Sequence, residues 1–193
     1  MVLFLQTPHL DLVASTLLHV DAEMAGRDQL ASLLGVVVPK AWPPAGVDRN
    51  VLGQARSRLA LEGQPSVGWY GWYAVSRRTA LQPPTLVGGG TFFGPPDGHG
   101  RVEMAFGVLP AFRGRGHATE MATALVDHAL SQPRVDCIVA HARAADRPTL
   151  AVLLRCGFIL ATPKPDNGLL RCERPRVLAP QEPAEEPAPD DEE

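Results

Sequence analysis

The feature that most constrains this chain is a glycine-rich loop between an apolar strand-like segment and an amphipathic helix. The loop runs from Arg113 to Ala118 with the sequence RGRGHA, shortly after an apolar segment that ends at Pro110. Apolar residues then recur with helical spacing, at positions 118, 121, 122, 125, 126 and 129. A helix that begins directly after a loop presents unpaired N–H groups and the positive end of its dipole. With Arg113 and Arg115 beside it, the loop predicts a site for a phosphate or pyrophosphate.

The loop differs from two common phosphate-binding motifs. A dinucleotide fold requires Gly-x-Gly-x-x-Gly, a P-loop requires Gly-Lys-Ser/Thr, and neither occurs here. Instead, Gly114, Gly116 and Ala118 are small enough for the backbone to approach phosphate oxygens closely. The alternative from the loop alone is an ordinary strand-to-helix turn with surface arginines. Because Glu103 lies on the segment leading into the loop, a possible base accompanies the anion site, which favours an enzyme with a phosphate-bearing co-substrate.

Hydrophobic patterning predicts an α+β domain with one mixed sheet. Helices are expected at Ala22–Leu34, at Val47–Glu62, after the loop, and at Asp146–Cys156 with Asp146 as N-cap and Gly157 at the C-terminal end. Short turns at Arg77–Pro84 and Gly94–Gly100 join three strands into an antiparallel meander. The expected strands are Leu10–Val13, Val67–Val75, Thr85–Phe93, Arg101–Leu109, Val135–Ala140, Phe158–Thr162 and Gly168–Cys172.

Composition limits the classes of function. A chain of 193 residues fits one domain, and no apolar run approaches the length of a membrane span. The N-terminus lacks the basic segment of a signal peptide, so a cytoplasmic protein with no membrane partner is expected. The widely spaced Cys137, Cys156 and Cys172 predict neither a zinc site nor a disulfide framework, and the histidines show no metal-binding spacing. No metal is therefore expected.

The net charge of −3 conceals an asymmetry between a domain and a tail. Residues 175–193 are rich in proline and acidic residues with few apolar ones, which predicts a disordered tail after a domain at residues 1–174. Residues 177–193 hold seven acids and no Lys or Arg, which leaves 14 acids against 18 bases, or +4, in residues 1–176. This mild positive charge suits a polyanionic co-substrate but is too weak and scattered to predict nucleic-acid binding.

The region around the loop resembles the GNAT acyltransferase superfamily, whose members bind acyl-CoA. Its signature, [Arg/Gln]-x-x-Gly-x-[Gly/Ala] after a strand ending in Val-x-Pro or Leu-x-Pro, corresponds to Arg113–Ala118 after Val108-Leu109-Pro110. The sequence is most similar to the branch of ribosomal-protein N-terminal acetyltransferases, with Glu-x-Gly-Tyr-x-Leu-x-Pro and then Arg-Gly-x-Gly-Tyr-Ala-Thr-Glu-Ala. Here EMAFGVLP at 103–110 and RGRGHATEM at 113–121 preserve that spacing through nineteen positions.

A second block of the family follows at the expected distance. The family pattern Asn-x-x-Ser, followed by an apolar stretch ending in Gly-Phe, corresponds to Asp146-Arg147-Pro148-Thr149 and then Gly157-Phe158. Asp in place of Asn and Thr in place of Ser keep the capacity for local hydrogen bonds. Together the two blocks cover roughly residues 67–172. The N-terminal third matches only in general layout.

The resemblance implies a GNAT-like fold, a donor and a mechanism. The central, mostly antiparallel sheet, flanked by helices, would splay between the strands of Val108 and Val139, and the pantetheine arm of acetyl-CoA would lie in that gap. Glu103 would be the general base that assists direct attack of a primary amine on the thioester in a ternary complex. The implied acetyl-CoA-binding residues are Phe106, Val108, Arg113, Gly114, Arg115, Gly116, His117, Ala118 and Thr149.

The acceptor and the general acid remain open at this point. The acceptor is a small-molecule amine or a peptide N-terminal amine, and the protein is a monomer or a homodimer. Many GNAT enzymes carry a tyrosine acid where this chain has Leu153, so solvent or His141 would protonate the leaving thiolate. Strand alternation predicts Trp69 and Tyr73 on one face, and Tyr70 and Trp72 on the other, either in the core or along an acceptor pocket. The alternative functions are an acyl-CoA-binding module with little activity and a fold relative that binds no CoA.

Overall fold

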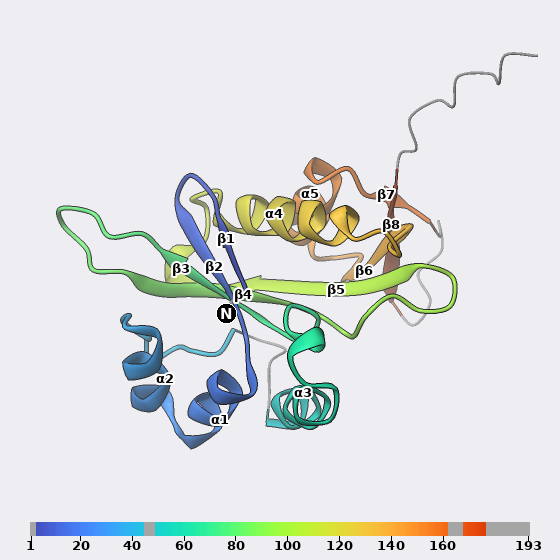
Figure 1. Ribbon diagram of the computed structural model, residues 1–193. Helices are drawn as coiled ribbons and strands as arrows, with labels where there is room; N and C mark the ends of the chain where they lie inside the picture. The colour runs from blue at the N-terminus through green and yellow to red at the C-terminus, as the bar shows by residue number, and fades with distance from the viewer. Residues whose placement is uncertain (1–2, 45–48, 162–167, 177–193) are drawn as a thin grey trace, which may run out of the picture.

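One eight-stranded sheet organises the computed structural model, which describes residues 3–44, 49–161 and 168–176 (Figure 1). Its strand order is β1-β2-β3-β4-β5-β6-β8-β7. Only β5 and β6 pair in parallel within the described sheet, and the other neighbours are antiparallel. This confirms the expected α+β fold. The strands are β1 Phe4–Gln6, β2 Leu10–Ala14, β3 Trp72–Ser76, β4 Thr85–Phe92, β5 Arg101–Val108, β6 Cys137–Arg143, β7 Ile159–Leu160 and β8 Leu169–Pro175.

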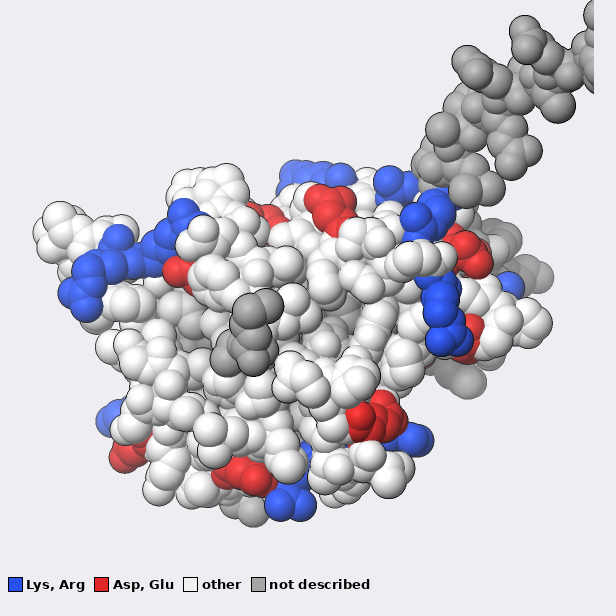
Figure 2. All heavy atoms as spheres, in the orientation of Figure 1, with Lys and Arg blue, Asp and Glu red and all other residues white. Residues whose placement is uncertain are grey.

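Helices cover both faces of the sheet (Figure 1). One layer holds α1 (Leu17–Ala25), α2 (Arg27–Leu34) and α3 (Arg49–Glu62), and the opposite layer holds α4 (His117–Ser131) and α5 (Arg147–Arg155). The larger hydrophobic core lies under α4, whose predicted apolar stripe is buried at Met121, Ala122, Leu125, Val126 and Ala129. Figure 2 shows charged side chains mainly around the rim of the face drawn, with uncharged side chains across its middle. No helix in the described ranges is long and apolar enough to cross a membrane.

The N-terminal elements differ from the predicted ones. The single helix expected at Ala22–Leu34 is two helices, because Gly26 at φ 148° ends α1 and begins α2. The first of them begins earlier than expected, at Leu17. Strand β1 was not expected, since three residues are too few to show a periodic pattern; its antiparallel pairing with β2 defines it.

The expected strand Val67–Val75 is also shorter than predicted. A 3-10 turn at Gln64–Ser66 and Gly68 at φ 98° keep the chain from extending before Trp72. The predicted alternation of aromatic faces is therefore wrong for Trp69, whose ring meets Phe92 in the core under α4, at 5.5 Å between centroids. Trp72 lies in that same core, whereas Tyr73 lies in the smaller core on the α2 side.

The predicted splay of the sheet lies between β5 and β6. Their parallel pairing ends at Met104 and Ala140, although β5 runs on to Val108 and β6 to Arg143. Over the same residues, β5 stays paired with β4. The two strands therefore separate toward their carboxyl ends, as the family resemblance implied.

The end of the sheet extends past the expected domain boundary. Strand β8 includes Pro175, and Arg176 donates from its side chain to the carbonyls of Val135 and Gln132. Order therefore continues beyond residue 174. The rest of the predicted tail, residues 177–193, lies outside the described residues.

The close contact of α4 with the sheet generates a stability prediction. Leu125 has no exposed surface, and a Cβ added at Gly90 of β4 would stand only 2.5 Å from its Cδ1. Leu125→Ala is therefore expected to lower the free energy of unfolding by about 2–5 kcal/mol, because it leaves a cavity in this core. Urea denaturation measures the change. The control is Leu81→Ala, at a residue with 94% exposure, which should change the free energy of unfolding by no more than about 0.5 kcal/mol. Equal losses of unfolding free energy in the two variants would contradict the role of Leu125 in the core.

Candidate active site

A cleft of about 530 Å³ opens beside the end of β5, beyond the point where its pairing with β6 stops. The end of β5, the loop after it, and the first turns of α4 and α5 form its wall. Eight residues expected to bind the donor lie on that wall: Phe106, Val108, Arg113, Gly114, Gly116, His117, Ala118 and Thr149. Residues from three separate elements thus converge on one space.

The loop leaves room and backbone donors for an anion. Gly116 is the N-cap of α4 at φ 82° and makes no side-chain capping bond, while Gly114 has φ 73°. A Cβ built on either glycine would meet nothing within 4 Å. The first intrahelical bond of α4 runs from the Glu120 N–H to the Gly116 carbonyl, so the N–H groups before it lack helical acceptors. This geometry suits a phosphate.

Arg113 and Arg115 have different positions. The Arg113 Nε donates to the Val108 carbonyl at 3.0 Å, which holds its side chain across the end of β5, on the wall of the cleft. Arg115 instead donates to the Ala111 carbonyl at 3.3 Å and lies over the Phe112 ring, 5.7 Å from its centroid. Arg115 does not line the cleft in the described structure, so its predicted contact with the donor stays a prediction.

His117 places an unsatisfied polar atom at the cleft. Its Nδ1 is buried and has no hydrogen-bond partner among the described residues. Burial lowers the pKa of His117, although the nearby Glu120 carboxylate opposes this shift. His117 lines the cleft, while its Nδ1 lies beneath the surface without a partner among the described residues.

The exposed edge of β5 faces the same opening. The carbonyl of Glu103 and the N–H of Leu109 both bond to the chain of β4 and its extension, at 3.0 and 2.9 Å. Since backbone groups alternate in direction along a strand, those of Phe106 and Val108 point the other way, toward the gap. The Phe106 groups and the Val108 N–H are therefore placed to pair with an extended ligand, whereas the Val108 carbonyl already accepts a hydrogen bond from Arg113.

The start of α5 has the predicted cap. Asp146 accepts hydrogen bonds from the Thr149 N–H at 3.2 Å and from the Thr149 hydroxyl at 2.7 Å. Both residues line the cleft. The Asp and Thr that replace the family's Asn and Ser thus bond to each other and cap the helix.

Glu103 and His141 form a pair that the parallel register explains. Glu103 Oε1 lies 3.0 Å from His141 Nδ1, and the side chains are 48% and 35% exposed. Because Glu103 lies opposite Val139, His141 stands two residues further along β6 on the same face. Neither side chain lines the cleft, but Glu103 shares its face of β5 with Ala105 and Gly107. The sequence indicated each residue separately and did not predict their contact.

A second cavity, the helix-side cavity, lies between the sheet and the helices α1 and α3 and encloses about 130 Å³. It shares Pro44, Phe106 and Gly107 with the cleft, so the two spaces meet at the end of β5. Tyr70 and Tyr73 both line it, although the predicted strand alternation places them on opposite faces.

The sequence analysis missed Glu23 of α1, which lines the helix-side cavity. Its two carboxylate oxygens accept from the Trp42 indole N–H and the Tyr73 hydroxyl, each at 2.6 Å. Burial raises the pKa of Glu23, and these two hydrogen bonds oppose the rise. The available signal was its position three residues after the buried Val20, on the same face of the helix.

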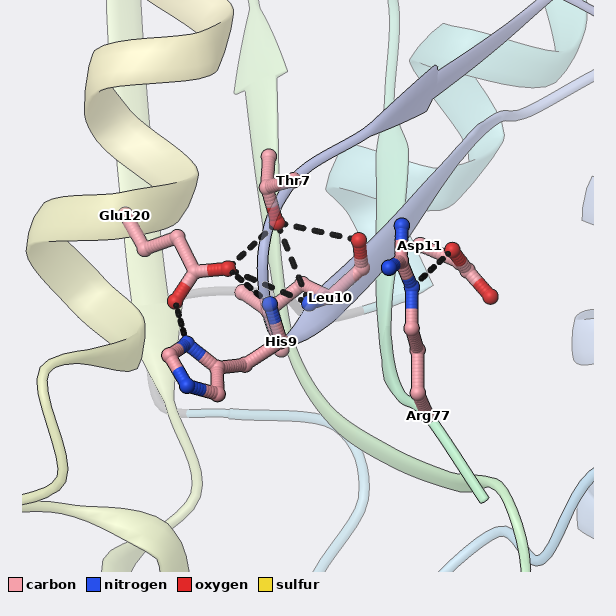
Figure 3. Close-up of polar contacts among 6 residues, drawn as sticks. All are labelled: Thr7, His9, Leu10, Asp11, Arg77 and Glu120. Atoms are coloured by element: carbon pink, nitrogen blue, oxygen red, sulfur yellow. Dashed lines mark hydrogen bonds and ion pairs between the residues drawn. The ribbon is translucent and has the colours of Figure 1, made fainter. Parts of the chain in front are cut away.

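Glu120 joins the first strands to the phosphate-loop end of α4 (Figure 3). Its carboxylate receives the N–H groups of His9 and Leu10, and lies 2.5 Å from the Thr7 hydroxyl and 3.0 Å from His9 Nδ1. The turn between β1 and β2 therefore bonds directly to the first turn of α4. This contact spans more than 100 residues of sequence.

Comparisons with known proteins agree with this geometry. A family model described as an acetyltransferase (GNAT) domain matches residues 22–159. An uncharacterized N-acetyltransferase, YjdG of Bacillus subtilis (strain 168), is 26% identical over 156 residues, which are 81% of this chain and 89% of that protein.

Solved structures share the fold at low identity. RimL, a ribosomal L7/L12 alpha-N-protein acetyltransferase solved in complex with coenzyme A, has a TM-score of 0.61 and 16% identity, covering 90% of this chain and 98% of its own. The microcin C7 self-immunity acetyltransferase MccE, solved with acetyl-CoA and AMP, has a TM-score of 0.57 and 15% identity, covering 88% and 94%.

The Glu120 contacts generate a prediction about stability and pH. Burial alone would raise the pKa of Glu120, but the hydrogen bonds from Thr7 and His9 bring it below its ordinary value. A lowered pKa contributes stability above the pKa of an unfolded glutamate, and this stability is lost as the pH falls through the folded value. Glu120→Gln should therefore lower the free energy of unfolding at pH 7 by about 1.5–3 kcal/mol, because the donors lose a charged acceptor.

Urea denaturation at pH 7 and at successively lower pH measures this difference. It should shrink as wild-type Glu120 takes up a proton. The matched control is Asp28→Asn, which neutralises a carboxylate with 88% side-chain exposure and should change stability by no more than about 0.5 kcal/mol. A difference between wild type and Glu120→Gln that stays constant with pH would contradict the role of the charge.

Proposed function

Because the chain belongs to the GNAT acetyltransferase family, we propose that it transfers an acetyl group from acetyl-CoA to a primary amine within a ternary complex. The observation that carries this proposal is the cleft lined by the end of β5, α4 and α5, which reaches the uncapped N-terminus of α4 and meets the helix-side cavity at Phe106 and Gly107. A donor site and an acceptor site that meet at Phe106 and Gly107 are what direct transfer requires.

The residues on the cleft wall fit acetyl-CoA. The N–H groups at the start of α4, with Arg113 beside them, would hold the pyrophosphate, and His117 would form part of the wall that the donor contacts. The backbone of Phe106 and Val108 would pair with the pantetheine arm along the edge of β5. Gly114 and Gly116 keep the loop open for the phosphates. The bound thioester supplies the acetyl group.

Glu103 is proposed as the general base, acting through water because it stands beyond the helix-side cavity on the same face of β5. In the transfer, the amine nitrogen forms a bond to the acetyl carbon and the carbon–sulfur bond breaks. The proton of the amine passes to Glu103, and the CoA thiolate takes a proton from solvent or from His141. The Val108 N–H, which points toward the gap, would stabilise the developing oxyanion, whereas the Leu109 N–H is already bonded to the Val87 carbonyl.

A low-activity acyl-CoA-binding protein is the second candidate. The position where many family members carry a tyrosine acid is Leu153, which is 1% exposed within the core under α4. This chain therefore presents no tyrosine acid from that position of α5. Turnover of acetyl-CoA with any member of an amine panel would exclude the second candidate.

Donor binding is tested at Gly116. Gly116→Glu should weaken acetyl-CoA binding by at least about 100-fold, or ~2.7 kcal/mol, because it places a carboxylate at the phosphate site and a side chain at positive φ. Isothermal titration calorimetry measures the dissociation constant. Gly98→Glu introduces the same group in a surface turn with open space and should bind as wild type does. Equal affinities for all three proteins would place the phosphates elsewhere.

The base is tested at Glu103. Glu103→Gln should lower kcat about 100-fold while acetyl-CoA affinity stays unchanged, because the amide cannot accept a proton from the amine. Steady-state assays across a pH series measure the loss. The control is Glu173→Gln on β8, which removes a carboxylate from the same face of the sheet, where it pairs with Arg171. A wild-type rate and pH profile in Glu103→Gln would show that another group is the base.

A further inference from the structure

We infer that the helix-side cavity selects a compact, positively charged amine with an apolar body, and that the Glu23 carboxylate is the counter-charge for its ammonium group as it binds. The ammonium then gives one proton to water, and the neutral amine reacts as proposed above, passing its second proton to Glu103. This inference rests on the proposed function, because it treats the helix-side cavity as the acceptor site. It narrows the acceptor from any primary amine to one chemical class. It also assigns a specificity role to a residue of the N-terminal third, where the sequence showed no motif.

The hydrogen bonds around Glu23 support its anionic form. The Trp42 indole nitrogen can only donate, and the Tyr73 hydroxyl donates to the second oxygen of the same carboxylate. Burial and the nearby Glu23 charge raise the pKa of Tyr73, which keeps its hydroxyl protonated and able to donate. Each Glu23 oxygen accepts one of these bonds and retains a further lone pair.

The charge of Glu23 has no cationic partner in the described structure. No Lys or Arg side chain lines the helix-side cavity among the described residues, and none forms an ion pair with Glu23 there. Arg56 of α3 instead forms an ion pair with Asp21, with 2.6 Å between its Nε and the Asp21 Oδ1. A half-buried carboxylate without a counter-ion is costly, so a cationic ligand is the complementary partner.

The rest of the helix-side cavity is apolar and aromatic. Val20 of α1, Leu52 and Ala55 of α3, and the rings of Tyr70 and Phe93 surround it. The Trp42 and Tyr73 rings, whose centroids are 5.9 Å apart, also line the cavity and meet the carboxylate through their N–H and O–H groups. With about 130 Å³ of space, the cavity suits a short alkyl or aryl body rather than a folded chain.

This arrangement also disfavours acidic acceptors. A carboxylate or phosphate on the acceptor would approach Glu23 in an enclosed space where like charges repel strongly. An amine should therefore bind better than the amino acid with the same side chain. The pair 2-phenylethylamine and phenylalanine differs only in the carboxylate and serves as the matched probe.

The test measures binding and transfer separately on the full chain. Calorimetry on protein saturated with CoA gives the affinity of each probe, and assays with acetyl-CoA give KM and kcat. Wild-type protein should bind 2-phenylethylamine at least tenfold more tightly than phenylalanine. Glu23→Gln, a neutral isostere, should weaken binding of 2-phenylethylamine and raise its KM about tenfold, with kcat and CoA affinity little changed, and should reduce the preference over phenylalanine.

The control is Asp28→Asn, which removes an exposed carboxylate from the same helical layer and should keep the wild-type preference. Equal affinities of the two probes for wild-type protein, or binding of neither, would overturn the inference without any variant. A fall in kcat with unchanged KM in Glu23→Gln would overturn it as well. Binding that depends on Glu23 but without acetyl transfer would support the inference and contradict the proposed function alone.

Discussion

The early end of the β5–β6 pairing is the constraint on which the rest of the site depends. The two strands share a register only as far as Met104 and Ala140, and then each continues alone. Continued pairing would close the cleft and occupy the edge of Phe106 and Val108. Because β4 holds β5 and β8 holds β6, each strand keeps its shape where the pair separates. The open edge is thus built into a rigid sheet.

The cleft and the helix-side cavity lie on opposite sides of one short piece of β5. Phe106 and Gly107 line both, so the strand beside the proposed donor site also borders the proposed acceptor site. The α4 side supplies backbone donors and small residues, which suit an anion. The side covered by α1 and α3 supplies aromatic rings and one carboxylate, which suit a cation. The two spaces therefore favour ligands of opposite charge, because a different helical layer lines each of them.

Local patterns were strong enough to predict the second half of the fold. The apolar stripe of α4, the Asp146 cap and the β5 strand each depend on contacts within a few residues, and all are present. Local patterns failed where tertiary contacts or single glycines decide. Gly26 divides the helix predicted at Ala22–Leu34 into two helices, and Gly68 makes β3 begin later than predicted. Strand β1 is defined by its pairing with β2.

By itself, the sequence determined the fold family and located the loop that we propose binds phosphate, because a loop motif and its helix are contiguous and keep their spacing. Only the tertiary structure brought Glu103 to His141, Glu120 to the β1–β2 turn, and Glu23 to Trp42 and Tyr73. Each of these contacts joins residues 19 or more positions apart, across a strand register or a helix–sheet interface. Such contacts follow from packing geometry, which no short stretch of sequence specifies.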